Sequence, residues 1–263
     1  MAAPNIRAPA VAGMFYPAQA QELRRMVRGY LSEAHPEGPA PKAIIAPHAG
    51  YIYSGPVAAS AYARLQGARS AIERVVLLGP SHRVAFAGLA APSAEYFATP
   101  LGNVPVDTEA LDSISDLPQV VRLDQAHALE HSLEVHLPFL QETLEHFSLV
   151  PLVVGDASPD EVDEVLERLW GGPETLIVVS SDLSHYHDYA SAQRMDEATS
   201  RAIERLEPEA IDYEDACGRN PVNGLLHLAK KLGLHAHTID LRNSGDTAGP
   251  RDQVVGYGAY VFH

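Results

Sequence analysis

The 263-residue sequence predicts an α/β fold: a single domain over residues 1–263, with a mixed central β-sheet flanked by helices. Short apolar runs rich in branched residues alternate with helical patterns, which is typical of βαβ units. The runs show no alternation of polar and apolar residues, so they suit central strands covered on both faces. No linker divides the chain and no segment repeats, which favours one domain.

The expected elements follow one another in a simple order. An amphipathic helix is expected over residues 18–33, ending at a proline-rich segment, residues 35–41. Strands are expected at 43–46, 75–78, 149–154, 176–179 and 254–262. The helical patterns between and after them are 56–65, 133–145, 159–170, 190–206 and 222–232. Residues 238–241 and 254–262 are expected to pair as an antiparallel addition at the sheet edge.

Composition excludes several classes of protein. Lys+Arg 19 against Asp+Glu 34 leaves a net charge of −15, which argues against binding nucleic acid or anionic membranes through a basic surface. Cys217 is the only cysteine, so an intrachain disulfide and a cysteine-based zinc finger are excluded. Residues 1–12 lack a signal-peptide pattern, and no apolar run approaches the roughly 20 residues that span a bilayer. We therefore expect a cytoplasmic protein with no membrane and no nucleic-acid partner.

Three of the expected strands are followed by a histidine. His48 follows residues 43–46, His82 follows 75–78 and His185 follows 176–179. In an open α/β sheet the carboxyl ends of neighbouring parallel strands meet at one rim, where ligands bind. One such histidine is more often a turn residue, but three favour a shared site. Neutral imidazole is the commonest metal ligand, and two histidines with one anionic ligand suit iron, copper or zinc.

Two other groupings of histidines and carboxylates could contribute to this site. Asp182 and His185 are spaced i, i+3, so they can form a ligand pair or an acid/base pair, unless Asp182 caps the next helix. His127, His131 and Glu134 are spaced by four and three, so they can share one helical face. If this face looks into the cleft, His131 and Glu134 line the pocket or support metal ligands. An amphipathic helix with a solvated polar side explains the pattern equally well.

Cys217 has two interpretations. A lone cysteine is most often a small buried hydrophobe. Just before the helical pattern at 222–232, however, a helix N-terminus would lower its pKa and favour the thiolate that metal binding or nucleophilic chemistry needs. We interpret the histidines outside these motifs as surface or packing residues: His35, His146, His187, His227, His235, His237 and His263.

With these segments in view, the chain resembles the Memo family, which is called AmmeMemoRadiSam system protein B in prokaryotes. The resemblance spans nearly the whole chain. The motifs that carry it are residues 10–17 (AVAGMFYP), 46–51 (APHAGY), 78–82 (LGPSH), 130–138 (EHSLEVHLP), 180–185 (SSDLSH), 217–221 (CGRNP), 243–246 (NSGD) and 255–260 (VGYGAY).

The resemblance implies a fold similar to the class III extradiol ring-cleaving dioxygenases, which hold non-haem iron(II) with two histidines and a carboxylate. His48 and His82 match the two histidine ligands, and Cys217 falls at the carboxylate position. His185 matches the acid/base histidine, with Asp182 beside it. A thiolate departs from the dioxygenase pattern, favours copper or ferrous iron, and is readily oxidised.

The resemblance therefore implies Fe(2+) as the first expectation for the metal, with Cu or Zn as alternatives. The residues expected to line the pocket are Tyr51, Ser81, Glu130, His131 and Glu134. In prokaryotes the family is associated with an AMMECR-type domain protein and a radical-SAM enzyme, so a functional association with both is expected.

Three functions remain open. The first is a dioxygenase-like, metal-dependent oxidoreductase in which His185 moves protons. The second is a non-catalytic module whose cleft holds a small molecule, a peptide, a protein partner or a metal. The third is a zinc-dependent hydrolase in which His185 activates water.

Overall fold

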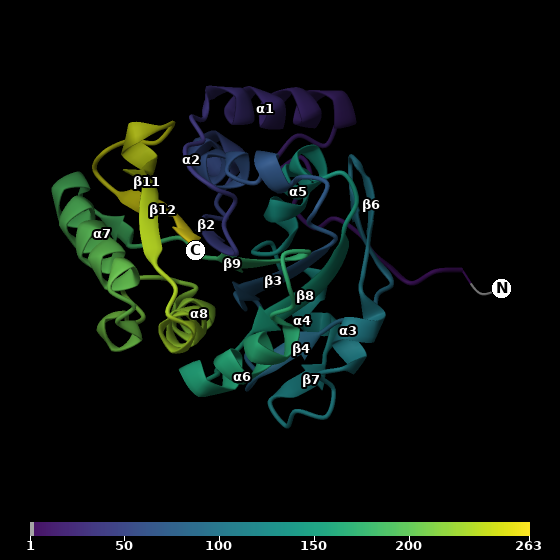
Figure 1. Cartoon of the computed structure of the whole chain (residues 1–263). Helices are drawn as coiled ribbons and strands as arrows, with labels where there is room; N and C mark the ends of the chain where they lie inside the picture. Colours follow the sequence, from purple (N-terminus) through teal and green to yellow (C-terminus); the bar gives the residue numbers. More distant parts are fainter. Residues whose placement is uncertain (1–2) are drawn as a thin grey trace.

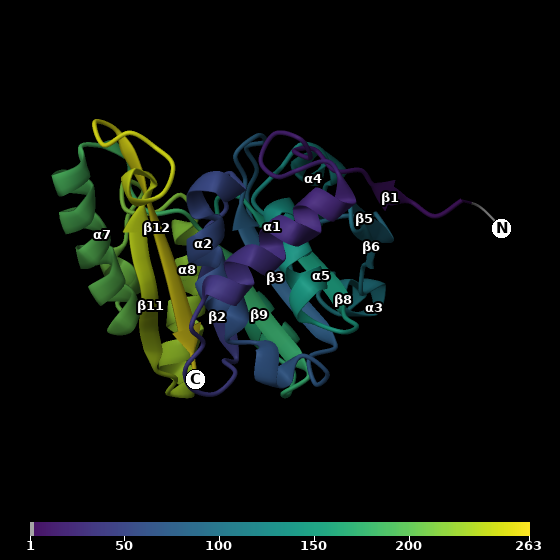
Figure 2. The same cartoon turned by 90° about the horizontal axis from the view of Figure 1, so that it is seen from above.

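The computed structural model describes residues 3–263 and has three layers, with helices on both faces of a mixed sheet (Figures 1 and 2). Four parallel strands lie side by side at its centre, in the order β2 (Ala43–Ala46), β9 (Thr175–Ser180), β3 (Arg74–Pro80) and β8 (Ser148–Val154). Nearly every residue of these strands is buried, as their uninterrupted apolar sequence requires. The predicted α/β fold with a mixed sheet is confirmed.

Antiparallel strands extend this parallel centre at both sides. β12 (Val254–Phe262) pairs with β2, and β11 (Ala236–Asn243) pairs with β12, so the predicted antiparallel addition is confirmed. The short β10 (His185–His187) also pairs with β12, with a shift of register between its two histidines. On the other side, β4 (Leu89–Ala91) is antiparallel to β8, and β7 (Val120–Arg122) is parallel to β4.

The helices cover the sheet in three groups (Figure 1). On one face lie α1 (Ala20–Glu33), α2 (Tyr51–Ala63) and α5 (Leu137–Thr143), and on the other lie α6 (Pro159–Leu169) and α8 (Arg219–Leu232). α7 (Tyr189–Glu204) packs against β11 and β12. Ser158 begins α6 with a capping box to Glu161, which satisfies backbone N–H groups at the helix start.

Two predicted helices have different bounds in the structure. α2 begins at Tyr51 rather than at residue 56, so Pro56 lies inside the helix. Tyr51 and Ser54 are buried in the first turn, and Pro56 has no N–H to donate to the preceding turn of the helix. The helix expected over residues 133–145 is instead the 3₁₀ turn η2 (Glu134–His136) followed by α5, in which Pro138 occupies the first turn.

Most of the segment between residues 81 and 132 was not predicted, because its elements are too short for a clear period. It contains β4, β7, α3 (Thr108–Asp112) and α4 (Asp124–Ala128). It also supplies β5 (Tyr96–Thr99) and β6 (Gly102–Pro105), which join β1 (Ile6–Arg7) in a second, three-stranded sheet. The short turns η1 (Gln66–Ala68), η3 (Pro208–Ala210) and η4 (Ser244–Asp246) complete the chain.

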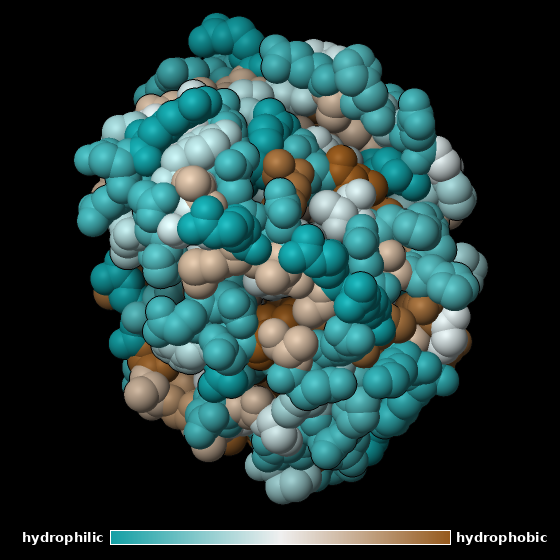
Figure 3. Space-filling model, turned by 90° about the vertical axis from the view of Figure 1, so that its left-hand side faces the viewer, coloured by the Kyte–Doolittle hydropathy of each residue, from teal (hydrophilic) through white to brown (hydrophobic). Residues whose placement is uncertain are grey.

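The surface is mostly hydrophilic on the side shown in Figure 3. Within residues 3–263, no helix combines the length and apolar character needed to cross a membrane. Figure 3 shows the side at the left of Figure 1, where hydrophilic residues cover most of the surface and hydrophobic residues form small separate groups.

Candidate metal centre

The carboxyl ends of β2, β9 and β3 meet at one rim of the sheet. Ala46 at the end of β2 pairs with Ser180 at the end of β9, and Leu78 near the end of β3 pairs with Val179. His48 and His82 each stand two residues beyond their strands, so the register brings the two side chains together. Their ring centroids are 5.1 Å apart.

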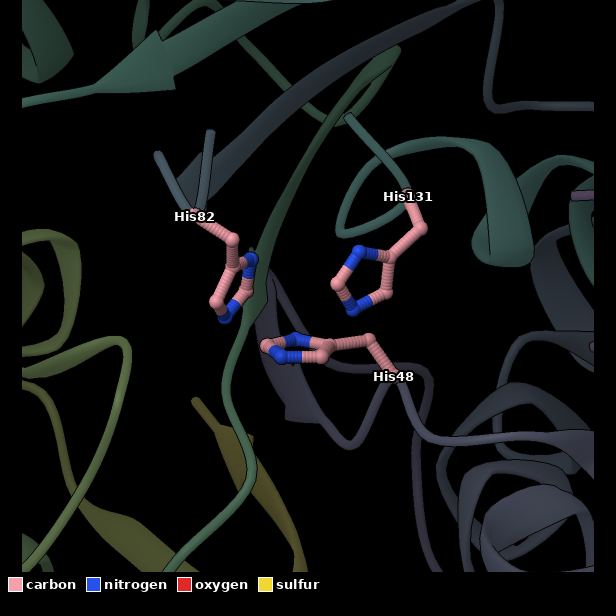
Figure 4. A group of neighbouring side chains, drawn as sticks. All are labelled: His48, His82 and His131. Carbon is pink, nitrogen blue, oxygen red and sulfur yellow. The ribbon is translucent and has the colours of Figure 1, made fainter. Parts of the chain in front are cut away.

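A third imidazole completes the group. One ring nitrogen from each of His48, His82 and His131 lies within 4.8 Å of the others, and the three rings point toward one another (Figure 4). The His82 and His131 rings are stacked, with centroids 4.6 Å apart. The His48 side chain is 2% exposed and that of His82 is 29% exposed, so the group opens toward solvent on the His82 side.

Hydrogen bonds determine which nitrogen of His48 is free. The Ser180 hydroxyl donates to the Ser132 carbonyl over 2.6 Å. It therefore accepts from His48 Nδ1 at 2.6 Å and from His136 Nε2 at 2.9 Å. Burial and the neighbouring imidazoles hold the pKa of His48 well below its usual value, so the ring is neutral. The lone pair on His48 Nε2 is left to face the group.

Glu130 orients His82 in a similar way. Its Oε1 accepts from His82 Nδ1 at 2.9 Å, and its Oε2 accepts the His82 backbone N–H at 2.6 Å. The same Oε1 accepts the backbone N–H groups of His131 and Ser132. Although burial acts to raise the pKa of Glu130, these bonds and the His82 ring outweigh it and hold the pKa at about 2. A carboxylate that fixes a histidine in this way is the usual outer support of a metal ligand.

Cys217 lies beside the three imidazoles. Its Sγ is 3.3 Å from His48 Nε2 and 3.6 Å from the Asp182 carbonyl. The next residue, Gly218, allows this approach, because a Cβ there would lie 2.5 Å from the Ser180 carbonyl oxygen. Burial raises the pKa of the thiol, contrary to the lowering expected from a helix N-terminus. Desolvation outweighs the helix, which begins two residues later at Arg219.

Asp182 and His185 flank the same rim. Asp182 Oδ1 accepts the His48 backbone N–H at 2.7 Å, and burial raises the pKa of this carboxyl to about 7. Asp182 does not cap the next helix, since Asp188 caps α7. His185 is half-buried, and burial together with the nearby His82 lowers its pKa. Tyr186, the next residue, has a left-handed φ of 60° at the bulge in β10, which is the kind of local strain that re-aims neighbouring side chains.

Comparison with known proteins identifies the family of the chain. The family profile described as "Memo-like protein" matches residues 7–261. The chain belongs to the Memo-like family.

Curated relatives are similar over nearly their full length. A "MEMO1 family protein" from Ignicoccus hospitalis is 38% identical, covering 98% of this chain and 98% of the relative. One from Aquifex aeolicus is also 38% identical, covering 98% and 99%. Among solved structures, the uncharacterized protein JW3007 from Escherichia coli K12 has a TM-score of 0.49 and 11% identity, covering 83% of this chain and 98% of that chain. The assignment rests on the sequence matches alone.

His127, His131 and Glu134 do not share a helical face, because α4 ends at Ala128.

Two residues expected to line the pocket of this Memo-like protein, Glu134 and Tyr51, make other contacts instead. Glu134 is fully buried, forms an ion pair with Arg7, and accepts the Tyr16 hydroxyl and two backbone N–H groups of the N-terminal segment. The buried Tyr51 donates its hydroxyl to the Val135 carbonyl at 2.6 Å. Both side chains therefore support the segment that carries His131.

A pocket of about 570 Å³ opens beside Cys217. It lies between the segment that follows β3, which includes Ser81, and the segment that precedes α8. Ser81 thus lines a pocket next to the site. Arg219 also lines it and was missed by the sequence reasoning, although it stands two residues from the only cysteine.

Proposed function

We propose that this Memo-like protein is a metal-dependent oxidoreductase. Ferrous iron is the first candidate metal, with His48, His82 and Cys217 as ligands and His131 within reach as a further nitrogen donor. The observation that carries the proposal is the convergence of three imidazoles, two of which have Nδ1 engaged in supporting hydrogen bonds. Cys217 would lose its proton on binding a metal, and the resulting thiolate favours copper or ferrous iron over harder metals.

Some residues of the site would bind the metal, and others would transfer protons. A bound iron or copper ion would supply one-electron redox chemistry. Asp182, with a pKa of about 7, can hold or release a proton at neutral pH beside His48. The His185 ring, with its lowered pKa, is neutral there and can accept a proton.

A zinc-dependent hydrolase is the second candidate, and the presence of His131 in the group favours it. Three histidines are a common catalytic zinc set, and His185 would then activate water. In this case Cys217 would lie next to the metal without binding it.

The family resemblance supports two further proposals about context. The cleft takes a small-molecule or peptide ligand, and the protein works with an AMMECR-type domain protein and a radical-SAM enzyme. We also propose a cytoplasmic location, as the sequence of residues 1–12 and the lengths of the apolar runs predict.

Anaerobic titration with Fe(II), Cu(I) and Zn(II), followed by an oxygen-uptake assay, tests the two functions. We expect wild type to retain iron or copper, and His48→Ala and His82→Ala to lose it. Cys217→Ser should lose iron and copper but keep zinc, because the soft ligand is removed. His146→Ala, an exposed histidine outside the group, is the matched control.

Each contrary result has a defined meaning. Metal retained by both histidine variants contradicts the metal centre altogether. A preference of the wild type for zinc without metal-linked oxygen uptake favours the hydrolase. A protein that takes up no metal, yet binds ligands in the cleft, is the non-catalytic module.

A further inference from the structure

The pocket beside Cys217 contains an arginine without a partner. The Arg219 guanidinium lies over the Tyr213 ring, 5.3 Å from its centroid, and its Nε is buried without a hydrogen bond. Within residues 3–263, Arg219 forms no ion pair with a carboxylate. In a chain of net charge −15, carboxylates are abundant, so an unpaired and half-buried arginine needs an explanation.

The surroundings of Arg219 suit one class of ligand. A buried N–H donor without a partner costs free energy that an incoming acceptor recovers. The planar guanidinium fork matches the two oxygens of a carboxylate or a phosphate. Val84, Phe86 and Pro221 line the same pocket and give it apolar surface. The volume, about 570 Å³, falls within the range of about 300–1,000 Å³ that small-molecule sites occupy.

We propose that this pocket binds a small organic acid, with its oxyanion on Arg219 and its apolar body against Val84 and Phe86. Because Cys217 lines the same pocket, such an acid would be presented to the metal centre, and this part rests on the proposed function. Asp156 also lines the pocket, but it is exposed and can turn toward water, whereas Arg219 is half-buried with its guanidinium over the Tyr213 ring.

Binding to metal-free protein tests the proposal without relying on the metal. Ligand-observed NMR would measure the affinities of benzoate, phenyl phosphate and the neutral benzamide. We expect wild type to bind at least one anion about tenfold more tightly than benzamide, and Arg219→Gln to abolish this preference. Comparison of the two anions distinguishes a carboxylate ligand from a phosphorylated one.

Arg64→Gln is the matched control, because Arg64 Nε is also buried without a hydrogen bond but lines a different pocket, beside Asp240. Asp156→Asn should keep the preference for the anion. The preferred anion should also slow alkylation of Cys217, the only cysteine, by iodoacetamide in wild type but not in Arg219→Gln.

Three results would overturn the proposal: equal affinity of wild type for benzamide and both anions, no binding of either anion up to its solubility limit, or equal losses in Arg64→Gln and Arg219→Gln. If the preferred anion binds but does not slow alkylation of Cys217, the acid is not presented to the metal centre. None of these outcomes affects the metal titration, so the two proposals fail independently.

Discussion

The Ser180 hydroxyl links the candidate metal centre to the protein core. It bonds to His48 Nδ1 on one side and to His136 Nε2 on the other, and His136 Nδ1 accepts the Tyr62 hydroxyl at 2.7 Å. All four side chains are buried, and with these roles each polar hydrogen in the chain of bonds has a protein acceptor. The chain therefore holds the His48 ring in the tautomer that a metal requires.

Ser180→Ala is expected to weaken metal binding by about 10–100-fold, because the His48 ring loses the acceptor that orients it. The free energy of unfolding of the metal-free protein should fall by about 1–3 kcal/mol, since two buried N–H groups lose their acceptor. Metal titration and urea denaturation measure the two effects.

Ser200→Ala is the control for Ser180→Ala. The Ser200 hydroxyl is also buried and bonds to the Tyr260 hydroxyl at 2.8 Å, but it lies on α7. We expect a comparable loss of stability with unchanged metal affinity. If Ser180→Ala binds metal as wild type does, the hydroxyl has no part in orienting His48.

At the scale of elements, two glycines let segments approach the ends of the central strands. A Cβ at Gly79, in β3, would lie 2.8 Å from Ser132 Oγ, so this glycine admits the segment that carries His131. Gly218 admits the segment that carries Cys217 against the end of β9. The lack of a side chain at Gly79 and Gly218 thus gives these segments room to approach the rim.

Gly218→Ala is expected to lower the free energy of unfolding by about 1–3 kcal/mol, because the new methyl group would collide with the Ser180 carbonyl. It should also move Cys217 and speed its alkylation.

Gly29→Ala provides a control with an effect of opposite sign on the free energy of unfolding. Gly29 lies within α1 with no atom close to its would-be Cβ, so alanine there should stabilise the protein by about 0.5–1 kcal/mol. Thermal unfolding distinguishes the two, and equal shifts would contradict the close contact at Gly218.

The secondary-structure elements also explain why some sequence predictions succeeded and others did not. β2, β3 and β9 are uninterrupted apolar runs, so their ends, and with them His48 and His82, could be placed from the sequence. His131 lies on an irregular segment after α4, whose position depends on the contact with Gly79. Periodicity carries no information about such a contact, and it suggested only that His131 could share a helical face with His127 and Glu134. The partners of Glu134 lie more than 110 residues away, which no local pattern reveals.

At the scale of the whole molecule, Glu134 anchors the N-terminal segment beside the site. The carboxylate and Arg7 are both buried, so removal of one charge leaves the other uncompensated. Glu134→Gln is expected to lower the free energy of unfolding by about 3–5 kcal/mol and to open residues 7–16 to proteolysis. Urea denaturation and limited proteolysis measure the two effects.

Arg201→Gln is the control for Glu134→Gln. Arg201 pairs with Glu197 on the exposed surface of α7, where such pairs contribute about 0–1 kcal/mol. Equal losses in the two variants would contradict the anchoring role of Glu134.

Acid sensitivity is another property of the whole molecule. Burial lowers the pKa of His127 to about 4, although its Nε2 donates to the Ala90 carbonyl. An unfolded chain would protonate this histidine at about pH 6.5. Stability from the neutral ring is therefore complete above pH 6.5 and is lost as the pH falls toward 4, by up to about 1.4 kcal/mol per pH unit. The equally buried His136, with a pKa of about 3, adds to this loss.

Urea denaturation of metal-free wild type and His127→Gln between pH 7 and pH 4.5 tests this effect. Glutamine keeps an N–H donor for the Ala90 carbonyl but does not titrate. The free energy of unfolding of His127→Gln should therefore fall less steeply with decreasing pH than that of wild type, by up to the amount that one histidine contributes. Parallel curves would mean that His127 titrates alike in the folded and unfolded chain.

The four side chains around the candidate metal centre come from residues 48, 82, 131 and 217, spread over most of the chain. A nascent chain leaves the ribosome with His48 first, yet its neighbour Cys217 is made 169 residues later. Until translation has passed Cys217, just before α8, the complete set does not exist. Metal loading is therefore expected to follow synthesis, and truncated products would not present a complete binding site to a redox-active ion.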